Sequence, residues 1–421
     1  MSSDPSLRQA TRVWARIGLL SFGGPAGQIA VMHRELVEER DWIDEPRFLH
    51  ALNFCMLLPG PEAMQLATYI GWLKHGWRGG LIAGGLFVLP GVLAIMALSW
   101  VYVLWGQGGW LAAVFFGLKA AVVAIVAQAL LKIAKRALKD GWAWAIALAA
   151  FVAIFALGVP FPLIVLAAAG FGFLRGRGGE RIEAQNAAQT GARPSVLGTI
   201  AIWLVLWLGP VAALILTLGM DHVFTQVAVY FSQMAVLTFG GAYAVLAWVA
   251  QAAVSEFGWL TAAQMLDGLA MAETTPGPLI MVTQFVGFMA GQSGGLATAT
   301  IAALITVWVT FAPCFLWIFA GAPYAEALRG NPALTSALSA VTAAVVGVIA
   351  NLALWFAIHA LFAQTQQIAG VELPMWSSLN PAAAGLTLLA LIAAFGLKVG
   401  PGVLIIGAAL AGAGLHVLGL A

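Results

Sequence analysis

Apolar residues run through this chain in long stretches, separated by short segments that are polar or contain glycine and proline. In the first half these stretches cover roughly 80–104, 111–131, 142–157 and 160–174, and in the second half about 296–320, 334–362, 380–395 and 401–419. One further stretch lies at about 197–218. About 20 apolar residues span a bilayer as a helix, and the period-two alternation of a membrane β-barrel is absent. The pattern predicts an all-α polytopic membrane protein.

Two motifs that break helices each occur twice, 217 positions apart. The first is an aromatic residue followed by two glycines, at Phe22, Gly23 and Gly24 and again at Phe239, Gly240 and Gly241. The second is Pro-Gly-Pro, at Pro59, Gly60 and Pro61 and again at Pro276, Gly277 and Pro278. Duplicated helix breaks inside apolar sequence predict a transporter built from two structural repeats.

The Pro-Gly-Pro motif separates two short apolar arms. In the first copy the arms are residues 48–58 and 63–73, with 11 residues each. At 1.5 Å per residue each arm reaches roughly 16 Å, about half of a ~30 Å bilayer core. Proline has no N–H and clashes with the preceding turn, so the helix ends there. The break is therefore predicted to lie near the membrane midplane.

Positive charge predicts how these segments enter the membrane. The loop 33–47 carries three arginines, whereas its counterpart at 251–262 carries no Lys or Arg. If the broken segments dip into the membrane and return, the arginine-rich loop lies in the cytoplasm, and if they cross the membrane, the assignment is inverted. Because Lys and Arg favour cytoplasmic loops, we expect the segments to dip and return. The unpaired stretch 197–218 adds one crossing, so the two repeats are expected to have inverted topology.

The expected organisation follows from these features. Repeat one covers 1–175, a polar linker 176–196, an unpaired transmembrane helix 197–218, and repeat two 219–421. Each repeat contains both breaks, followed by transmembrane helices. The broken, re-entrant helices of the two inverted repeats are expected to meet near the bilayer midplane.

Composition narrows the possible functions. Of the 421 residues 62% are hydrophobic and 9% charged, so the lipid bilayer is an expected partner. The net charge is only +2, so nucleic acid is not expected as a partner. Two cysteines in apolar runs and six scattered histidines give no metal-ligand spacing, so neither a metal nor a cofactor is expected. Phosphate-binding and hydrolase motifs are also absent, and active transport would therefore draw on an ion gradient.

The four breaks predict an anion site. Each break precedes a new helical arm, whose first turn has unpaired N–H groups and about half a positive charge. Four such helix starts meeting near the midplane would bind a dianion with backbone groups alone. The alternative is that the breaks are packing kinks, a common use of Gly and Pro in membrane helices.

Polar side chains near the breaks are candidate partners of the anion or of a coupling proton. Lys119, in an apolar run, is either a counter-charge for the anion or a lysine that reaches the interface. Glu62 and Glu273 flank the Pro-Gly-Pro motifs, where they would carry an exchanged proton or complement a helix start. Arg16 is an anion partner or an interface arginine. Neutral groups that could bond an oxyanion, or else a neighbouring helix, are Asn53, Gln65, Thr274, Thr275 and Gln284. The first four of these, with Lys119 and both motifs, form the predicted substrate-binding set.

These motifs resemble those of the chromate ion transporter family in its long, two-domain form. The segments 20–25 and 53–62 carry the resemblance, as do their second copies at 237–241 and 272–279, and it covers nearly the whole chain. It implies a secondary transporter, not an enzyme, that exports chromate across the cell inner (plasma) membrane and confers chromate resistance.

Two alternatives to chromate export stay open. Chromate is a tetrahedral dianion similar to sulfate, so sulfate or another small oxyanion is an alternative substrate. An intramembrane reductase or a sensor is the alternative of another class. The sequence also leaves open the coupling ion and the oligomeric state, a homodimer included.

We predict that loops 32–47 and 251–262 lie on opposite sides of the membrane, the former in the cytoplasm. In a background without Cys55 and Cys314, Glu256→Cys should react with an impermeant thiol reagent added to intact cells, and Glu38→Cys should not. Labelling of position 38 alone would show that the orientation is the reverse. Labelling of both positions would contradict the placement of the two loops on opposite sides of the membrane.

Overall fold

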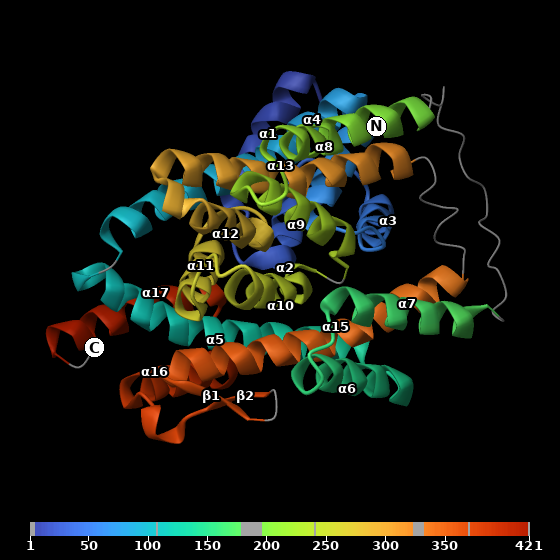
Figure 1. Ribbon diagram of the computed structural model, residues 1–421. Coiled ribbons are helices and arrows are strands. Elements are labelled where there is room, and N and C mark those ends of the chain that lie inside the picture. The colour runs from blue at the N-terminus through green and yellow to red at the C-terminus, as the bar shows by residue number, and fades with distance from the viewer. Residues whose placement is uncertain are drawn as a thin grey trace. The chain divides into compact units, whose positions relative to one another are not determined.

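The computed structural model describes residues 5–106, 108–177, 196–239, 241–322, 332–368 and 371–419. Over these residues the chain is largely helical, with one short β-hairpin (Figure 1). Five helices are long and apolar enough to cross a membrane: α4 (Glu62–Trp105), α5 (Gly109–Ala137), α8 (Val196–Leu218), α13 (Leu296–Gly321) and α15 (Pro332–Leu361). The predicted all-α polytopic class is confirmed.

The other α-helices are shorter. They are α1 (Leu7–Leu20), α2 (Gly24–His33), α3 (Glu45–Cys55), α6 (Gly141–Phe155), α7 (Phe161–Gly176), α9 (Val223–Leu237), α10 (Ala242–Gln251), α11 (Ala262–Thr274), α12 (Val282–Ala290), α16 (Pro381–Leu391) and α17 (Pro401–Val417). Short π-helical or 3-10 turns lie at Arg34–Glu38, Ala252–Glu256, Leu279–Met281, Gln292–Gly294, Trp376–Ser378 and Ile392–Gly396. Strand β1 (Thr365–Ile368) pairs antiparallel with β2 (Val371–Pro374), with Thr365 opposite Pro374.

The two halves of the chain present the same order of elements at their starts. α1, α2, a π-helical turn and α3 in the first half correspond to α9, α10, a π-helical turn and α11 in the second. The π-helical turns also end alike, since the Trp42 N–H donates to Leu36 O and the Trp259 N–H donates to Ala253 O, both at 2.8 Å. The inverted topology and the four predicted segments stay predictions, and residues 178–195 of the linker lie outside the described part of the chain.

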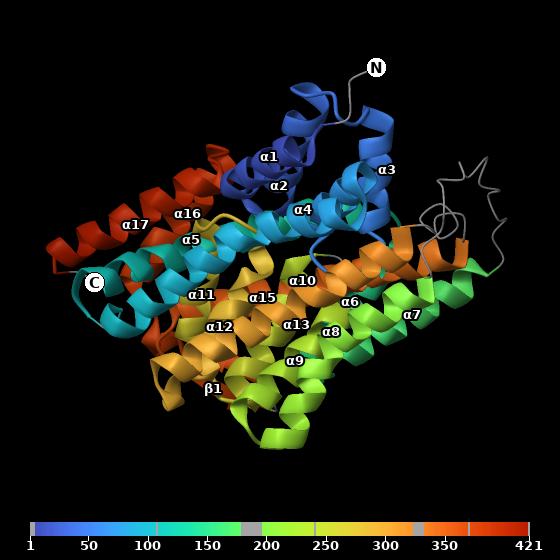
Figure 2. The ribbon, with the colours of Figure 1, turned by 90° about the horizontal axis from the view of Figure 1, so that it is seen from above.

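The chain folds into two compact units, and each unit takes residues from both halves. Unit 1 comprises Met1–Met96, Phe171–Val245 and Thr275–Leu338, and unit 2 comprises Ala97–Gly170, Leu246–Thr274 and Ser339–Ala421. Within unit 1, α13 packs on α8, α9 and α12 (Figure 2). Within unit 2, α5 packs on α11, α16 and α17.

α4 is interrupted near the end of the predicted arm 63–73. His75 and Gly76 have non-helical backbone, with Gly76 at φ 59° and ψ −151°, a conformation that glycine adopts without steric cost. The chain reverses there, because Gly71 and Gly79 approach so closely that neither has room for a Cβ. The half-bilayer arm after the first Pro-Gly-Pro is therefore a separate helix, as its length predicted.

The chain also folds back at the first Pro-Gly-Pro turn. The rings of Phe54 in α3 and Tyr69 in α4 lie 5.3 Å apart, although Tyr69 stands roughly 10 Å along α4 from its first residue. Two arms in line would keep these rings far apart, so the arms lie side by side. α1 and α2 likewise pack on each other across the first glycine pair (Figure 2). Both broken segments of the first half are therefore helical hairpins, and their dip into the membrane and return stays a prediction.

A buried carboxylate anchors the loop that follows α2. Glu35 is fully buried and lies 2.6 Å from Arg40 and 3.1 Å from Arg16. Arg16, a candidate anion partner by sequence, therefore pairs with a carboxylate of its own unit. In the same loop, hydrogen bonding to Glu45 raises the pKa of His33 above its usual value.

Glu35→Gln is expected to lower the Tm of the detergent-solubilised protein, because Arg16 and Arg40 lose a buried counter-charge. The loss should correspond to about 1–3 kcal/mol of unfolding free energy. Glu39→Gln is the matched control, since Glu39 is 42% exposed and exposed ion pairs contribute about 0–1 kcal/mol. Equal Tm values for the two variants, measured by scanning fluorimetry, would contradict the anchoring role.

Candidate functional site

A small cavity in unit 1 is lined where four helical segments begin. It is bounded by Pro25 and Gln28 of α2, Glu62 and Ala63 of α4, Ala242 of α10, Leu279 and Ile280 of the 3-10 turn before α12, and the turn residues Pro61 and Pro278. Both Pro-Gly-Pro motifs and both arms after the glycine pairs therefore reach one cavity, as their duplication predicted. Its volume is about 10 Å³, room for roughly one water molecule.

The cavity combines positive helix ends with one carboxylate. The first turns of α2, α4 and α10 have N–H groups that make no bond within their own helix, and they carry the positive ends of the helix dipoles. Glu62 is the first residue of α4, and a Cβ placed on Gly241 would lie 3.9 Å from Glu62 Oε1. Glu62 therefore lies between two helix starts. A dianion could bind beside it only if this carboxylate were protonated or moved away.

Matching backbone hydrogen bonds tie the breaks of one half to the breaks of the other. The Gly60 N–H donates to Thr238 O at 2.7 Å, and the Gly277 N–H donates to Ser21 O at 2.9 Å. In sequence, Gly60 is equivalent to Gly277 and Ser21 to Thr238. Each Pro-Gly-Pro turn is therefore bonded to the glycine-pair break of the opposite half, in the same way both times.

Both Pro-Gly-Pro turns require glycine. Gly60 has φ 122° and Gly277 has φ 98°, in the region that residues with a Cβ rarely adopt. A Cβ on Gly277 would lie 3.2 Å from the Cα of Gly91 in α4, and one on Gly60 would lie 3.0 Å from the sulfur of Cys314 in α13. Gly91 and Cys314 each follow a proline within their helix. The two turns therefore pack in equivalent ways on two proline-containing helices.

Two buried glutamines bind backbone carbonyls at the breaks, and a third binds a carbonyl inside α4. Gln65 Nε2 donates to Pro59 O at 2.7 Å and Gln28 Nε2 to Gly277 O at 2.6 Å, whereas Gln284 Nε2 donates to Val92 O of α4 at 3.0 Å. Carbonyls without a helical partner are costly in apolar surroundings, so Gln65 and Gln28 support the breaks. Gln28 was not among the predicted residues. The signal for it is a polar residue one turn after the glycine pair in an apolar arm.

The remaining predicted residues of unit 1 lie in several environments. Phe22 and Asn53 are exposed, Thr275 is buried, and Phe239 is half-buried. Gly23, Gly24 and Gly241 have positive φ immediately before helix starts that line the cavity. Gly240 lies outside the described residues. Substrate binding by any of these residues stays a prediction.

Unit 2 contains the other predicted residues, Lys119, Glu273 and Thr274. Lys119 Nζ lies 3.3 Å from Asp267 Oδ1, and the Tyr102 hydroxyl donates to Asp267 Oδ2 at 2.9 Å. The Thr274 hydroxyl donates within its own helix. Sequence reasoning missed Asp267 and Tyr102, and the available signal was an aspartate in the apolar arm that precedes the second Pro-Gly-Pro.

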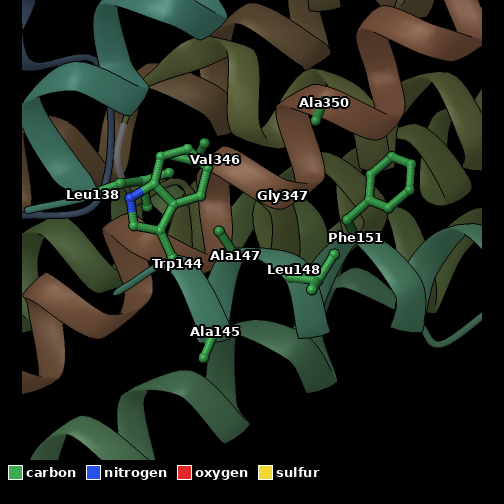
Figure 3. Close-up of a pocket in the computed structure, with 9 residues that line it drawn as sticks. All are labelled: Leu138, Trp144, Ala145, Ala147, Leu148, Phe151, Val346, Gly347 and Ala350. Carbon is green, nitrogen blue, oxygen red and sulfur yellow. The ribbon is translucent and has the colours of Figure 1, made fainter. Parts of the chain in front are cut away.

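A larger groove of about 370 Å³ lies between α6 and α15 of unit 2 (Figure 3). Its lining is Leu138, Trp144, Ala145, Ala147, Leu148, Phe151, Val346, Gly347 and Ala350. None of these side chains is charged, and Trp144 is the one among them with an N–H donor, so the groove offers little to an oxyanion that leaves water. The small cavity at the helix starts is chemically the better candidate for an anion.

Gly277→Ala is expected to abolish transport and to lower the Tm, because it adds about 1–2 kcal/mol of backbone strain and a close contact with Gly91. Gly60→Ala should act in the same way through its contact with Cys314. The matched control is Gly85→Ala, since Gly85 lies in α4 and a Cβ there meets nothing within 4 Å. Normal flux and Tm in Gly277→Ala would contradict the close packing of the turn.

The chain is similar in sequence to known transport proteins over most of its length. The chain matches the family model described as chromate transporter over residues 8–173 and 225–413. It is 32% identical to the probable chromate transport protein of Synechococcus elongatus, over 82% of this chain and 83% of that protein. It is 31% identical to the chromate transport protein of Cupriavidus metallidurans, over 82% and 81% of the two chains. For the chromate transport protein of Pseudomonas aeruginosa the identity is 35%, over 79% and 77%.

No solved structure matches the chain. The family match nevertheless extends over both halves and takes in both pairs of helix breaks. Taken together with the shared cavity at these breaks, it shows that the chain belongs to the chromate transporter family.

Proposed function

We propose that this chain is a secondary transporter that exports chromate across the cytoplasmic membrane, draws on an ion gradient and thereby confers chromate resistance. The observation that carries the proposal is the cavity where α2, α4, α10 and the turn before α12 begin together. The matched relatives are named chromate transport proteins, which favours transport over an intramembrane reductase or a sensor. Assembly as a homodimer belongs to the same proposal.

Helix starts suit this substrate. Chromate carries two negative charges on four oxygens, and backbone N–H groups at several helix ends can bond those oxygens without adding a mobile counter-charge. Such a site recognises charge and tetrahedral shape rather than the central atom. Sulfate has the same charge and shape, so it is the second candidate substrate and an expected competitor.

Transport requires the cavity to open. A volume of about 10 Å³ holds roughly one water and is too small for an ion with four oxygens. The two cross-repeat hydrogen bonds, Gly60 N–H to Thr238 O and Gly277 N–H to Ser21 O, hold the breaks together. We infer that one of these equivalent contacts loosens when the site opens to one side of the membrane and the other when it opens to the opposite side.

Glu62 is the candidate carrier of the coupling proton at this cavity, and Glu273 is the corresponding candidate in unit 2. As a carboxylate, Glu62 competes with a bound anion for the positive helix starts. A proton on Glu62 removes that competition, so proton binding and anion binding become linked.

Purified protein in vesicles is expected to move labelled chromate, and excess sulfate should reduce the chromate flux. Cells that express the protein should accumulate less chromate than cells without it, because the proposed direction is outward. Vesicles in which chromate flux equals that of protein-free vesicles would overturn the proposal. Flux in vesicles without lower accumulation in cells would overturn only the export direction.

Glu62→Gln is expected to make chromate flux independent of an imposed pH gradient, because the amide cannot take up or release the proton. Exchange of labelled for unlabelled chromate at equal pH should continue. Glu38→Gln is the control, since this loop carboxylate is 60% exposed and stands away from the breaks in sequence. If chromate flux through Glu62→Gln follows the pH gradient as it does through the parent, Glu62 does not carry the coupling proton.

A further inference from the structure

A buried group of three polar side chains in unit 2 has no role in the cavity at the helix starts. Asp267 of α11 accepts a hydrogen bond from the Tyr102 hydroxyl at 2.9 Å and lies 3.3 Å from Lys119 Nζ of α5. The Tyr102 ring packs edge-on against Phe115, with 5.2 Å between ring centroids. The three polar groups come from α4, α5 and α11, within one compact unit.

Burial of these charges lowers the stability of the fold, so a purely structural role would explain the group poorly. The Asp267 side chain is 7% exposed and its chain neighbours Leu266 and Gly268 are also buried, as are Leu118 and Ala120 beside Lys119. Removing two opposite charges from water costs several kcal/mol per ion, and well-packed apolar residues would often stabilise the same place equally well. Ionisable residues inside apolar helices therefore point to function.

The groups that face Asp267 limit what it can bind. α11 packs on α5 and α17, and Tyr102 reaches it from α4. The titratable groups that act on Asp267 are Lys119 and Tyr102, whereas His416 of α17 packs against Trp110. Lys132 of α5 stands roughly 20 Å further along that helix and Glu273 roughly 9 Å along α11.

A proton suits this arrangement better than a metal cation. The Tyr102 hydroxyl donates a hydrogen bond to the carboxylate, and the Lys119 ammonium, its ion-pair partner, has no acceptor atom. The oxygen ligands that a sodium ion would need are therefore not supplied by these two neighbours. A metal cation would also be repelled by the Lys119 ammonium a few ångströms away. A proton from water, bound to one Asp267 oxygen, neutralises the carboxylate and needs no further ligand.

Neutralising Asp267 leaves Lys119 with its positive charge and without its partner. The ammonium group has three N–H donors and can turn toward another oxyanion. Its side chain is 23% exposed, against 7% for Asp267, so Lys119 has an open side from which an anion can approach. The Asp267 carboxylate and an incoming oxyanion therefore compete for one cation.

We propose that Lys119 and Asp267 form a proton-gated anion site, in which deprotonated Asp267 holds Lys119 and protonated Asp267 releases it to the transported oxyanion. This inference rests on the proposed function, because it names residues that would hold the substrate. Because Glu62 would add a pH dependence of its own at the helix starts, the variants below are compared in a Glu62→Gln background, which is the parent of this test.

The test is the pH dependence of chromate affinity in the full-length protein. Half-saturating chromate is measured from initial flux in vesicles at acidic, neutral and alkaline pH, with equal pH on both sides. For the parent it should rise with pH. Asp267→Asn, whose amide oxygen still accepts from Tyr102, should bind chromate at every pH as the parent does in acid. Lys119→Gln should bind about tenfold more weakly or worse at every pH, the effect of losing a charge-assisted hydrogen bond.

The neutral pair Lys119→Gln/Asp267→Asn separates this role from a structural one. If the ion pair only supports the fold, the double variant should recover the affinity and the pH dependence of the parent. If the pair is the anion site, it should bind as weakly as Lys119→Gln while its Tm stays near that of the parent. Tyr102→Phe keeps both charges and should keep the pH dependence. Recovery in the double variant, or a parent-like pH dependence in Asp267→Asn, would overturn the proposal.

A second measurement separates this inference from the proposed function. The rise in Tm that chromate or sulfate causes in detergent-solubilised protein reports binding without transport. A parent protein that moves no chromate but is stabilised most in acid, with that pH dependence lost in Asp267→Asn, would refute transport and support the site. Chromate flux together with a stabilisation that Asp267→Asn leaves pH-dependent would support transport and refute the site.

Discussion

A backbone N–H or C=O that has lost its helical partner inside apolar surroundings must find another one, and this requirement governs the architecture of unit 1. Glycine pairs and Pro-Gly-Pro motifs end helices there, which leaves donors and acceptors at every break. The Gly60 and Gly277 N–H groups bond to Thr238 and Ser21 carbonyls of the opposite half. Buried glutamines bond to the Pro59 and Gly277 carbonyls. Each break is therefore stabilised by a segment that is far away in the sequence.

This mutual dependence has a functional consequence. A helix interior is satisfied by its own hydrogen bonds, whereas a break satisfied by another segment can change partners when that segment moves. The equivalent contacts, one from each half, give two similar arrangements that a small shift could exchange. Four helical segments also begin at the shared cavity, where the proposed function places the oxyanion. The breaks thus join the two halves and also line the candidate site.

The buried carboxylates and Glu62 are likewise stabilised by positive groups from other parts of the structure. Glu35 is fully buried and paired with two arginines, Asp267 is buried and paired with a lysine and a tyrosine, and Glu62 stands at a helix start. Each carboxylate is held by a different source of positive charge: a guanidinium, an ammonium or a helix dipole. In the proposals only the last two would compete with an oxyanion, because Glu35 ties the loop after α2 to Arg16 of α1 and to Arg40. The proposals thus assign Glu35 to anchoring, and Asp267 and Glu62 to proton and anion binding.

Much of this protein could be derived from the sequence alone. Apolar stretches gave the transmembrane class and most helix positions, and the α8 range agrees with the predicted 197–218 within one residue. The positions of proline and glycine predicted the helix breaks and the end of the arm near residue 73, because these residues change the backbone within their own helical turn. Duplication of the motifs gave the meeting of the Pro-Gly-Pro turns at one cavity.

The tertiary structure decided which distant residues meet. Gln28 and Gly277 are separated by 249 positions and Tyr102 and Asp267 by 165, and no local pattern links the members of either pair. The two compact units mix residues from both halves, which a linear division of the chain does not express. Helix formation and termination depend on interactions within about one turn, so the local sequence determines them. The partner of a buried charge or of a free carbonyl depends on how helices pack, so only the folded chain determines it.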